Sequence, residues 1–284
     1  MKSNVSASMY SGFSSLLKTH GIECAASLAA SLGFSSVEFI DIIGAGSPTF
    51  QNTDQAILAR NILHKHALSV SCYSVGINLV NIESGIQKNP AAIAELKRIA
   101  DIAASLGSPY LHHTLFVNLT LPHNSPSFDE MLYPVVDAAV EVAGYCKNLG
   151  VSCIYENQGM YFNSVCNFRR FFHLMKSYCD NVGVCGDVGN SLFVDEEPFP
   201  FFETFVDDIK HVHLKDYKKT EHIRELKSRG GTYLENVPIG TGDIDIASCL
   251  KTLKKHGYSG AFSMEDEFID ALPNTFSYLN KNFI

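Results

Sequence analysis

The chain has 284 residues, of which 46% are hydrophobic, and a formal net charge of −8 at pH 7. This length and hydrophobic content suffice for the core of one large domain and exclude a disordered chain. The acidic balance argues against a nucleic-acid partner, because non-specific binding to nucleic acid relies on Lys and Arg to neutralise phosphates.

The location of the protein is indicated by its apolar runs and its cysteines. The N-terminus has no hydrophobic signal-peptide region, and no apolar run approaches the about 18 residues of a membrane span. Eight cysteines are scattered without a CxxC pair, which is typical of free thiols in a reducing compartment. We therefore expect a soluble cytoplasmic protein without a membrane partner.

Short runs typical of β-strands alternate with longer helical patterns along the chain. We expect strands at 6–10, 36–42, 68–75, 108–114, 151–157, 181–187, 209–216 and 259–267. We expect helices at 23–33, 53–67, 90–107, 128–149, 164–180, 198–208, 243–257 and 270–284. Gly33 is expected to end the first helix, Thr53 to cap the second, and Pro90 to begin the third.

Eight β-then-α units in 284 residues predict a (β/α)8 TIM barrel, with residues 1–284 forming a single domain. The alternative is a doubly wound open sheet, which requires a GxGxxG phosphate turn after the first strand. The segment "SMYSGFSS" (8–15) does not supply that turn, and no change of composition divides the chain. The barrel is therefore favoured.

Polar residues at the C-terminal ends of barrel strands gather at one mouth. The last four expected strands carry Glu156, Asp187, His213 and Glu265 at these ends. Each alone could be a structural hydrogen-bonding residue, but three carboxylates and an imidazole close together require positive charge. A divalent metal ion supplies that charge and keeps open positions for substrate oxygens. We expect Mn²⁺ first, with Mg²⁺, Co²⁺ or Zn²⁺ as alternatives.

Two histidines lie in the segment "KHVHLKD" (210–216). His211 and His213 are two residues apart on a strand, so their side chains point to the same face. Only one of them can lie at the mouth. We assign His213, the later residue, to the metal and His211 to the barrel interior.

Other strand-end side chains are candidates for substrate binding. His112 and His113 are neighbours that point opposite ways, and we expect the later one, His113, to face the mouth. Lys215 could bind a substrate carboxylate or an enolate oxygen, and Glu38 could accept a hydrogen bond from a substrate hydroxyl. Each of these two could equally be a surface or structural residue.

Two further segments have ordinary explanations beside functional ones. Asp243, in the turn "VPIGTGDID" (237–245), is expected mainly to cap the helix that follows, and backbone N–H groups of this turn could contribute to phosphate binding. Tyr161 and Phe162 could shield the site from water, and rim packing would explain them equally well.

Five segments, in this order, resemble one superfamily. They are "IYENQG" (154–159), "GVCGDVGN" (183–190), "KHVHLKD", "VPIGTGDID" and "FSMEDE" (262–267). The superfamily is that of the xylose isomerase-like TIM barrels, which includes sugar phosphate isomerases, ketose 3-epimerases, inosose dehydratases and abasic-site endonucleases. The resemblance implies that Glu156, Asp187, His213 and Glu265 bind one divalent metal ion. It further implies that Glu156 and Glu265 exchange protons with the substrate carbon.

The chain departs from this superfamily at several positions. Asn190 stands where the family often has a histidine after the sixth-strand aspartate; asparagine could hydrogen-bond a substrate hydroxyl but is a poor metal ligand. The endonucleases carry further histidine ligands, where this chain has "LEN" (234–236) and Tyr73. A repair nuclease is therefore disfavoured.

The function that we expect is that of a metal-dependent isomerase or epimerase of carbohydrates. It would act on a ketose or related polyol carbonyl by abstracting the proton alpha to the carbonyl, through an enediolate, with two glutamates as acid and base. The alternatives are a hydro-lyase of the inosose dehydratase type and a non-catalytic sugar-binding barrel. Family barrels often pair, so a homo-oligomer is a further expectation of the resemblance.

Overall fold

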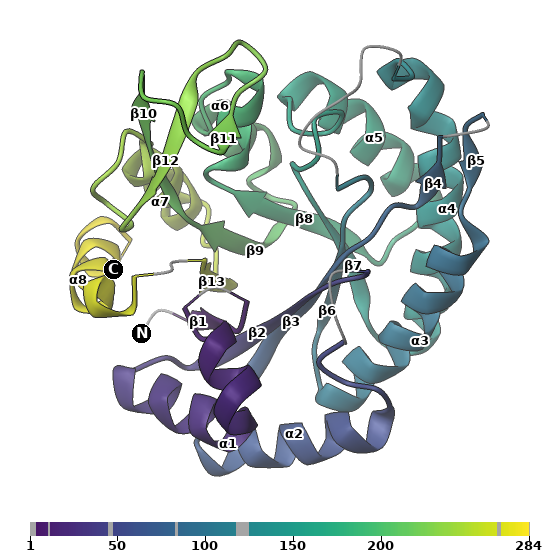
Figure 1. Ribbon diagram of the computed structural model, residues 1–284. Coiled ribbons are helices and arrows are strands. Elements are labelled where there is room, and N and C mark those ends of the chain that lie inside the picture. The colour runs from purple at the N-terminus through teal and green to yellow at the C-terminus, as the bar shows by residue number, and fades with distance from the viewer. Residues whose placement is uncertain are drawn as a thin grey trace.

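Eight parallel strands close into a barrel in a computed structural model that describes residues 4–10, 12–44, 48–82, 85–117, 125–265 and 268–283. Around the ring, the strands follow the order β1-β13-β9-β8-β7-β6-β3-β2 (Figure 1). Their bounds are β1 (Val5–Ser8), β2 (Ser36–Ile42), β3 (Ser69–Gly76), β6 (Tyr110–His113), β7 (Ser152–Glu156), β8 (Val182–Asp187), β9 (Ile209–Leu214) and β13 (Ala261–Met264). The predicted (β/α)8 barrel is confirmed.

Helices surround the barrel on the outside (Figure 1). Those in the described part of the chain are α1 (Ser14–Leu32), α2 (Thr53–Lys65), α3 (Pro90–Leu106), α4 (Phe128–Asn148), α5 (Val165–Tyr178), α6 (Phe199–Phe205), α7 (Ile246–Lys255) and α8 (Leu272–Asn282). Two short 3₁₀ helices, η1 (Asn190–Val194) and η2 (Ile269–Ala271), add to them. Within the described residues, no helix combines the length and apolar character needed to cross a bilayer.

Helix boundaries agree with the sequence where the terminal signals are strong. In α3, Pro90 is the first residue, the Asn89 side chain accepts a hydrogen bond from the Ala92 N–H, and Gly107 ends the helix with a left-handed φ of 76°. At α1 the prediction was too short: the helix begins at Ser14 and continues across Gly21, whose φ of 77° kinks it.

Two predicted helix caps were wrong by one or two residues. The side chain of Asn52, not that of Thr53, accepts the N–H of Gln55 at the start of α2. At α7, Asp245 caps the helix by accepting the Ser248 N–H, whereas the Asp243 carboxylate accepts the Lys219 N–H at 2.8 Å. Several capping side chains in succession compete for one helix start, so spacing alone does not choose between them.

An antiparallel sheet that the sequence analysis did not predict lies between β9 and α7. It pairs β10 (Asp216–Thr220) with β12 (Tyr233–Val237), and β12 with β11 (Leu226–Lys227). The expected strand at 209–216 is therefore two strands, β9 and β10, which are separated only by Lys215. The Asp216 carboxylate anchors this sheet to the 237–245 turn, because it accepts the N–H groups of Gly240 and Gly242 at 2.9 Å each. A second small addition is the hairpin of β4 (Val80–Asn81) and β5 (Gln87–Lys88).

The interior of the barrel is polar and lined partly by small side chains. Ser6, Ser8, Ser74 and Ser263 are all buried. Side chains alternate along each strand, so Tyr155 on β7 faces outward, with its ring 5.1 Å from that of Phe171 on α5, while Glu156 faces inward. The small residues leave room inside the barrel for larger polar groups.

We predict that Phe168→Ala destabilises the protein strongly, because this residue sits at the centre of the packing between α5 and α6. Its fully buried ring lies 5.0 Å from that of Phe201 and 5.1 Å from that of Phe205. The free energy of unfolding, measured by chemical denaturation, should fall by about 3–5 kcal/mol. Tyr178→Ala at the exposed end of α5 is the control and should change it by less than about 0.5 kcal/mol.

Candidate metal centre

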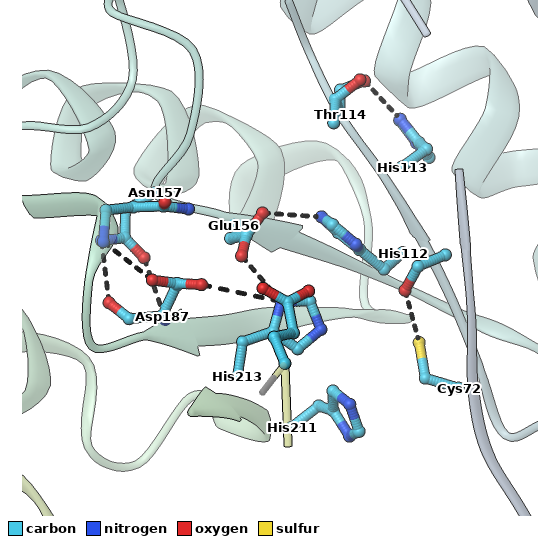
Figure 2. Close-up of polar contacts among 12 residues, drawn as sticks. Cys72, His112, His113, Thr114, Glu156, Asn157, Asp187, His211 and His213 are labelled. Carbon is cyan, nitrogen blue, oxygen red and sulfur yellow. Dashed lines mark hydrogen bonds and ion pairs between the residues drawn. The ribbon is translucent and has the colours of Figure 1, made fainter. Parts of the chain in front are cut away.

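Four side chains from consecutive strands meet at the C-terminal mouth of the barrel. Glu156 ends β7, Asp187 ends β8, His213 lies near the end of β9, and Glu265 directly follows β13. Strand register brings them to one level, because Asp187 pairs with His213, which in turn pairs with Ser263 of β13. Figure 2 shows Glu156, Asp187 and His213 side by side, and the Glu265 carboxylate lies 3.5 Å from His213, so the selected residues are neighbours in space.

The Nδ1 atom of His213 is the point on which the three carboxylates converge. It lies 2.7 Å from Glu156 Oε1, 3.5 Å from Glu265 Oε1 and 3.8 Å from Asp187 Oδ2. Glu156, Asp187 and His213 are buried, and the Glu265 side chain is only 15% exposed. A small region therefore holds three carboxylate oxygens and one imidazole nitrogen.

The other nitrogen of His213 faces a fourth carboxylate, that of Glu38. Glu38 Oε1 lies 3.0 Å from His213 Nε2, and Glu38 Oε2 lies 3.1 Å from His211 Nε2. The Ser74 hydroxyl donates a further hydrogen bond to Glu38 Oε1. This placement corrects the expectation that Glu38 contacts substrate, because both of its carboxylate oxygens are already bonded to His213, His211 and Ser74. His211 lies in the interior, as expected.

Electrostatics in this cluster favour a charged pair. Burial raises the pKa of Glu38, but the positive charges of His213 and His211 lower it more, so that the pKa lies well below its usual range. Burial lowers the pKa of His213, yet the carboxylates of Glu38, Glu265 and Glu156 hold it well above the usual range. To bind a metal ion through Nδ1, His213 has to release the proton on that nitrogen. The proton on Nε2 stays on the ring and is donated in a hydrogen bond to Glu38. A histidine ligand oriented in this way by a carboxylate is common in metal sites.

Asp187 presents one oxygen to the site. Its Oδ1 accepts the N–H groups of Gly189 and Asn190 at 2.7 and 2.8 Å, and Asn157 bonds both the N–H and the C=O of Asp187. Among the described residues, Oδ2 accepts no well-aligned hydrogen bond, although it lies 2.8 Å from Lys215 Nζ. Burial raises the pKa of Asp187 to about 6, against the opposing effect of the Lys215 ammonium.

Lys215 and Asn190 also belong to this site. Lys215 Nζ lies 2.7 Å from Glu265 Oε2 and 3.5 Å from Asn190 Oδ1. The Nδ2 group of Asn190 is buried and has no hydrogen-bond partner in the described part of the chain. Two hydrogen-bond donors therefore stand beside the carboxylates, at the positions where substrate contacts were predicted.

The expectation that His113 faces the mouth is wrong, and His112 occupies that place. His112 Nε2 lies 3.6 Å from Glu156 Oε2, whereas the ring of His113 packs edge-on against outward-facing Tyr155. Figure 2 shows His113 turned away, toward the backbone of Thr114. Neighbouring residues on a strand point to opposite faces, so the choice between His112 and His113 depends on which alternate set of β6 side chains faces inward. The inward positions of Glu156 on β7 and Asp187 on β8 did not establish this for β6.

The aromatic residues after β7 are explained by packing. The ring of Tyr161 contacts that of Phe116 at 5.5 Å, and the ring of Phe162 lies 5.6 Å from Phe128 and 5.4 Å from Phe171. Both residues are buried. These contacts provide the rim packing that the sequence analysis gave as the alternative to shielding.

The donor set fits a hard or borderline divalent cation. Three carboxylates and one imidazole are ligands for Mn²⁺, Mg²⁺, Co²⁺ or Zn²⁺, and Asp187 Oδ2 is a buried carboxylate oxygen without a well-aligned donor. Asp187, His213 and Glu265 each offer a ligand atom within 4.8 Å of the others. Cys185 lies beneath Glu156 and His213, but burial raises the pKa of its thiol well above the usual range, so a thiolate ligand is disfavoured.

Two contributors to the site were missed at the level of sequence. Ser74 lies two residues after Cys72 on the inward face of β3, and Asn157 directly follows Glu156. Period-two alternation could have placed Ser74 inside the barrel. No spacing rule indicated that Asn157 would reach across to the backbone of Asp187.

Residues 26–276 match the family described as Xylose isomerase-like TIM barrel. Among curated proteins, the inosose dehydratase of Clostridium perfringens is 32% identical over 101 residues, which are 34% of this chain and 34% of that protein. The chain thus matches about a third of the length of this curated relative.

Solved structures share the fold over nearly the whole chain. A xylose isomerase-like TIM barrel protein of Mycobacterium smegmatis, in complex with magnesium, has a TM-score of 0.72 at 17% identity and covers 99% of this chain and 98% of its own. A D-allulose 3-epimerase of Methylomonas sp., in complex with D-allulose, has a TM-score of 0.71 at 16% identity, with coverage of 99% and 98%. At these identities the likeness concerns the fold alone.

We predict that Glu38→Gln weakens metal binding, because Gln removes the negative charge that orients His213 and retains its Nε2 proton. The dissociation constant for Mn²⁺, measured by calorimetry on chelator-treated protein, should rise about 10–100-fold. Glu23→Gln is the matched control, since Glu23 pairs with His66 at 2.7 Å on the surface. Unchanged Mn²⁺ affinity in a folded Glu38→Gln variant would rule out this positioning role.

Proposed function

This chain belongs to the xylose isomerase-like TIM barrel family, and from that premise we propose that it is a divalent-metal-dependent isomerase or epimerase of carbohydrates. Its substrate would be a ketose or a related polyol carbonyl compound. The reaction would begin with removal of a proton from the carbon next to the carbonyl. Mn²⁺ is the metal that we expect, with Mg²⁺, Co²⁺ or Zn²⁺ as alternatives.

The observation that carries the proposal is the pair of glutamates at His213 Nδ1. Glu156 and Glu265 come from different strands, β7 and β13, and their Oε1 atoms lie 2.7 and 3.5 Å from the same nitrogen. Isomerisation and epimerisation both need one group that removes a proton and another that returns it. Two carboxylates that approach one point from separate strands are suited to this exchange.

The metal ion would be held by Glu156, Asp187, His213 and Glu265. When bound, such an ion would withdraw electrons from the carbonyl and neighbouring hydroxyl of the substrate and so acidify the C–H bond beside them. Burial of the ligands keeps water away from the site, and a low local dielectric strengthens each electrostatic contact.

Proton transfer would be carried out by the chain's own carboxylates. One glutamate would take the proton from the substrate carbon, which leaves an enediolate, and the other would return a proton to the opposite face or to the adjacent carbon. Lys215 and Asn190 lie beside these carboxylates and could donate hydrogen bonds to substrate oxygens. In this scheme the two glutamates alternate between acid and base.

A hydro-lyase is the second candidate, favoured by one specific observation. The curated relative named above and others of 30–32% identity are inosose dehydratases, although the matched segments are short. A dehydratase of this kind would also begin with removal of the proton beside the carbonyl. It would then expel a hydroxyl from the next carbon as water, so the glutamates alone do not distinguish it from an epimerase.

We predict that the protein, supplied with Mn²⁺ in D₂O, introduces deuterium at the carbon beside the carbonyl of a ketose or inosose. The measurement is proton NMR and mass spectrometry over a panel of both substrate types. A product of unchanged composition identifies an isomerase or epimerase, and loss of one water identifies the lyase. A saturable ligand without any exchange would identify a binding protein and contradict the proposal.

We further predict that Glu156→Gln and Glu265→Gln each slow this exchange at least about 100-fold, because each removes one acid–base group. Glu141→Gln on α4, whose carboxylate pairs with Lys97 on the surface, is the control and should exchange like the wild type. Exchange at the wild-type rate in both site variants would refute the assigned roles of the glutamates.

A further inference from the structure

Positive charge inside the candidate metal centre is already supplied by the chain itself. We propose that Lys215 is a resident cation that holds Asp187 and Glu265 in the metal-free protein and competes with the divalent ion for both carboxylates. The inference rests on the proposed function, since it presumes that a metal ion binds at His213. It adds that the affinity for this ion is set partly by a lysine that is not a ligand.

The contacts of Lys215 involve the same carboxylates that a metal ion would use. Its ammonium lies 2.8 Å from Asp187 Oδ2 and 2.7 Å from Glu265 Oε2. The Oδ1 atom of Asp187 is occupied by the N–H groups of Gly189 and Asn190, so Oδ2 is the oxygen left for a metal ion. Lysine and metal ion therefore compete for one atom of Asp187, and they share the carboxylate of Glu265.

Packing holds the lysine in this position. The Lys215 side chain is only 13% exposed, and its aliphatic stem lies against Gly189. A Cβ atom at position 189 would lie 2.6 Å from Lys215 Cγ and 2.8 Å from a ring atom of Tyr217. The glycine thus makes room for the Lys215 stem and for the Tyr217 ring, which both lie beside it. Low exposure and this close packing distinguish Lys215 from a mobile surface lysine.

The direction of the effect follows from Coulomb's law. An ammonium within hydrogen-bond distance of two metal ligands repels an arriving divalent cation, and this repulsion is weakly screened because the site is buried. Removing the ammonium leaves the same carboxylates with one positive charge fewer. The metal-free site then becomes less stable, and its affinity for a divalent ion becomes higher.

The test compares Mn²⁺ binding by chelator-treated wild-type protein and by Lys215→Met, using calorimetry or the spectroscopic signal of free Mn²⁺. We expect Lys215→Met to bind Mn²⁺ at least tenfold more tightly, while Lys215→Arg, which keeps the charge, stays closer to the wild type. Lys147→Met is the control, because Lys147 is exposed and pairs with Asp180 at 2.7 Å on the surface. This control should bind Mn²⁺ like the wild type.

Thermal unfolding supplies a second readout. Without metal, the midpoint of Lys215→Met should lie below that of the wild type, and saturating Mn²⁺ should remove the difference. If Lys215→Met does not fold without metal, Mn²⁺ is expected to restore the fold; a variant that stays unfolded in saturating Mn²⁺ overturns the proposal.

The outcomes separate this inference from the function on which it rests. If the wild type binds Mn²⁺ and Lys215→Met binds it equally or more weakly, the resident-cation role is overturned and the proposed metal enzyme stands. If neither protein binds a divalent ion, both proposals fall. If only Lys215→Met binds one, competition by the lysine is supported.

Discussion

Repulsion among buried carboxylates is the constraint around which this barrel is organised. Three of them lie within 3.8 Å of a single imidazole nitrogen, and a fourth faces the other nitrogen of the same ring. Such a cluster is unfavourable in a low-dielectric interior unless cations and hydrogen-bond donors balance it. His213, His211, Lys215 and the backbone N–H groups after Asp187 provide that balance.

The parallel barrel makes this concentration of charge possible. Its strands bring residues that are far apart along the chain to one level, and period-two alternation directs every second side chain inward. Serines on β1, β3 and β13 occupy little volume, so the interior accommodates Glu38 and two imidazoles without a large apolar core at that level. The apolar packing that stabilises the fold lies instead between the strands and the helices, for example around Phe168.

Sequence reasoning predicted the barrel because strand and helix patterns alternate eight times, and it selected four residues that meet at the mouth because each ends a strand. It failed where the position of a side chain depends on how the strands are arranged in the closed barrel. Glu38 is the third residue of β2 and does not end that strand. Its contact with His213 depends on barrel closure and on the stagger between strands, which the sequence does not show. The choice between His112 and His113 required the inward parity of β6. The sheet of β10, β11 and β12 was missed because β10 (DYKKT) and β12 (YLENV) contain few apolar residues, and β11 has only two residues.

Lys215 connects the antiparallel sheet outside the barrel directly to the candidate metal centre. Lys215 is the single residue between β9 of the barrel and β10 of the antiparallel sheet. A change in the position of that sheet would therefore shift the backbone of Lys215, because no other residue separates β9 from β10. Changes in the length or composition of the 221–232 segment therefore offer protein engineers a means to adjust the cation remotely, with every group that touches it left intact.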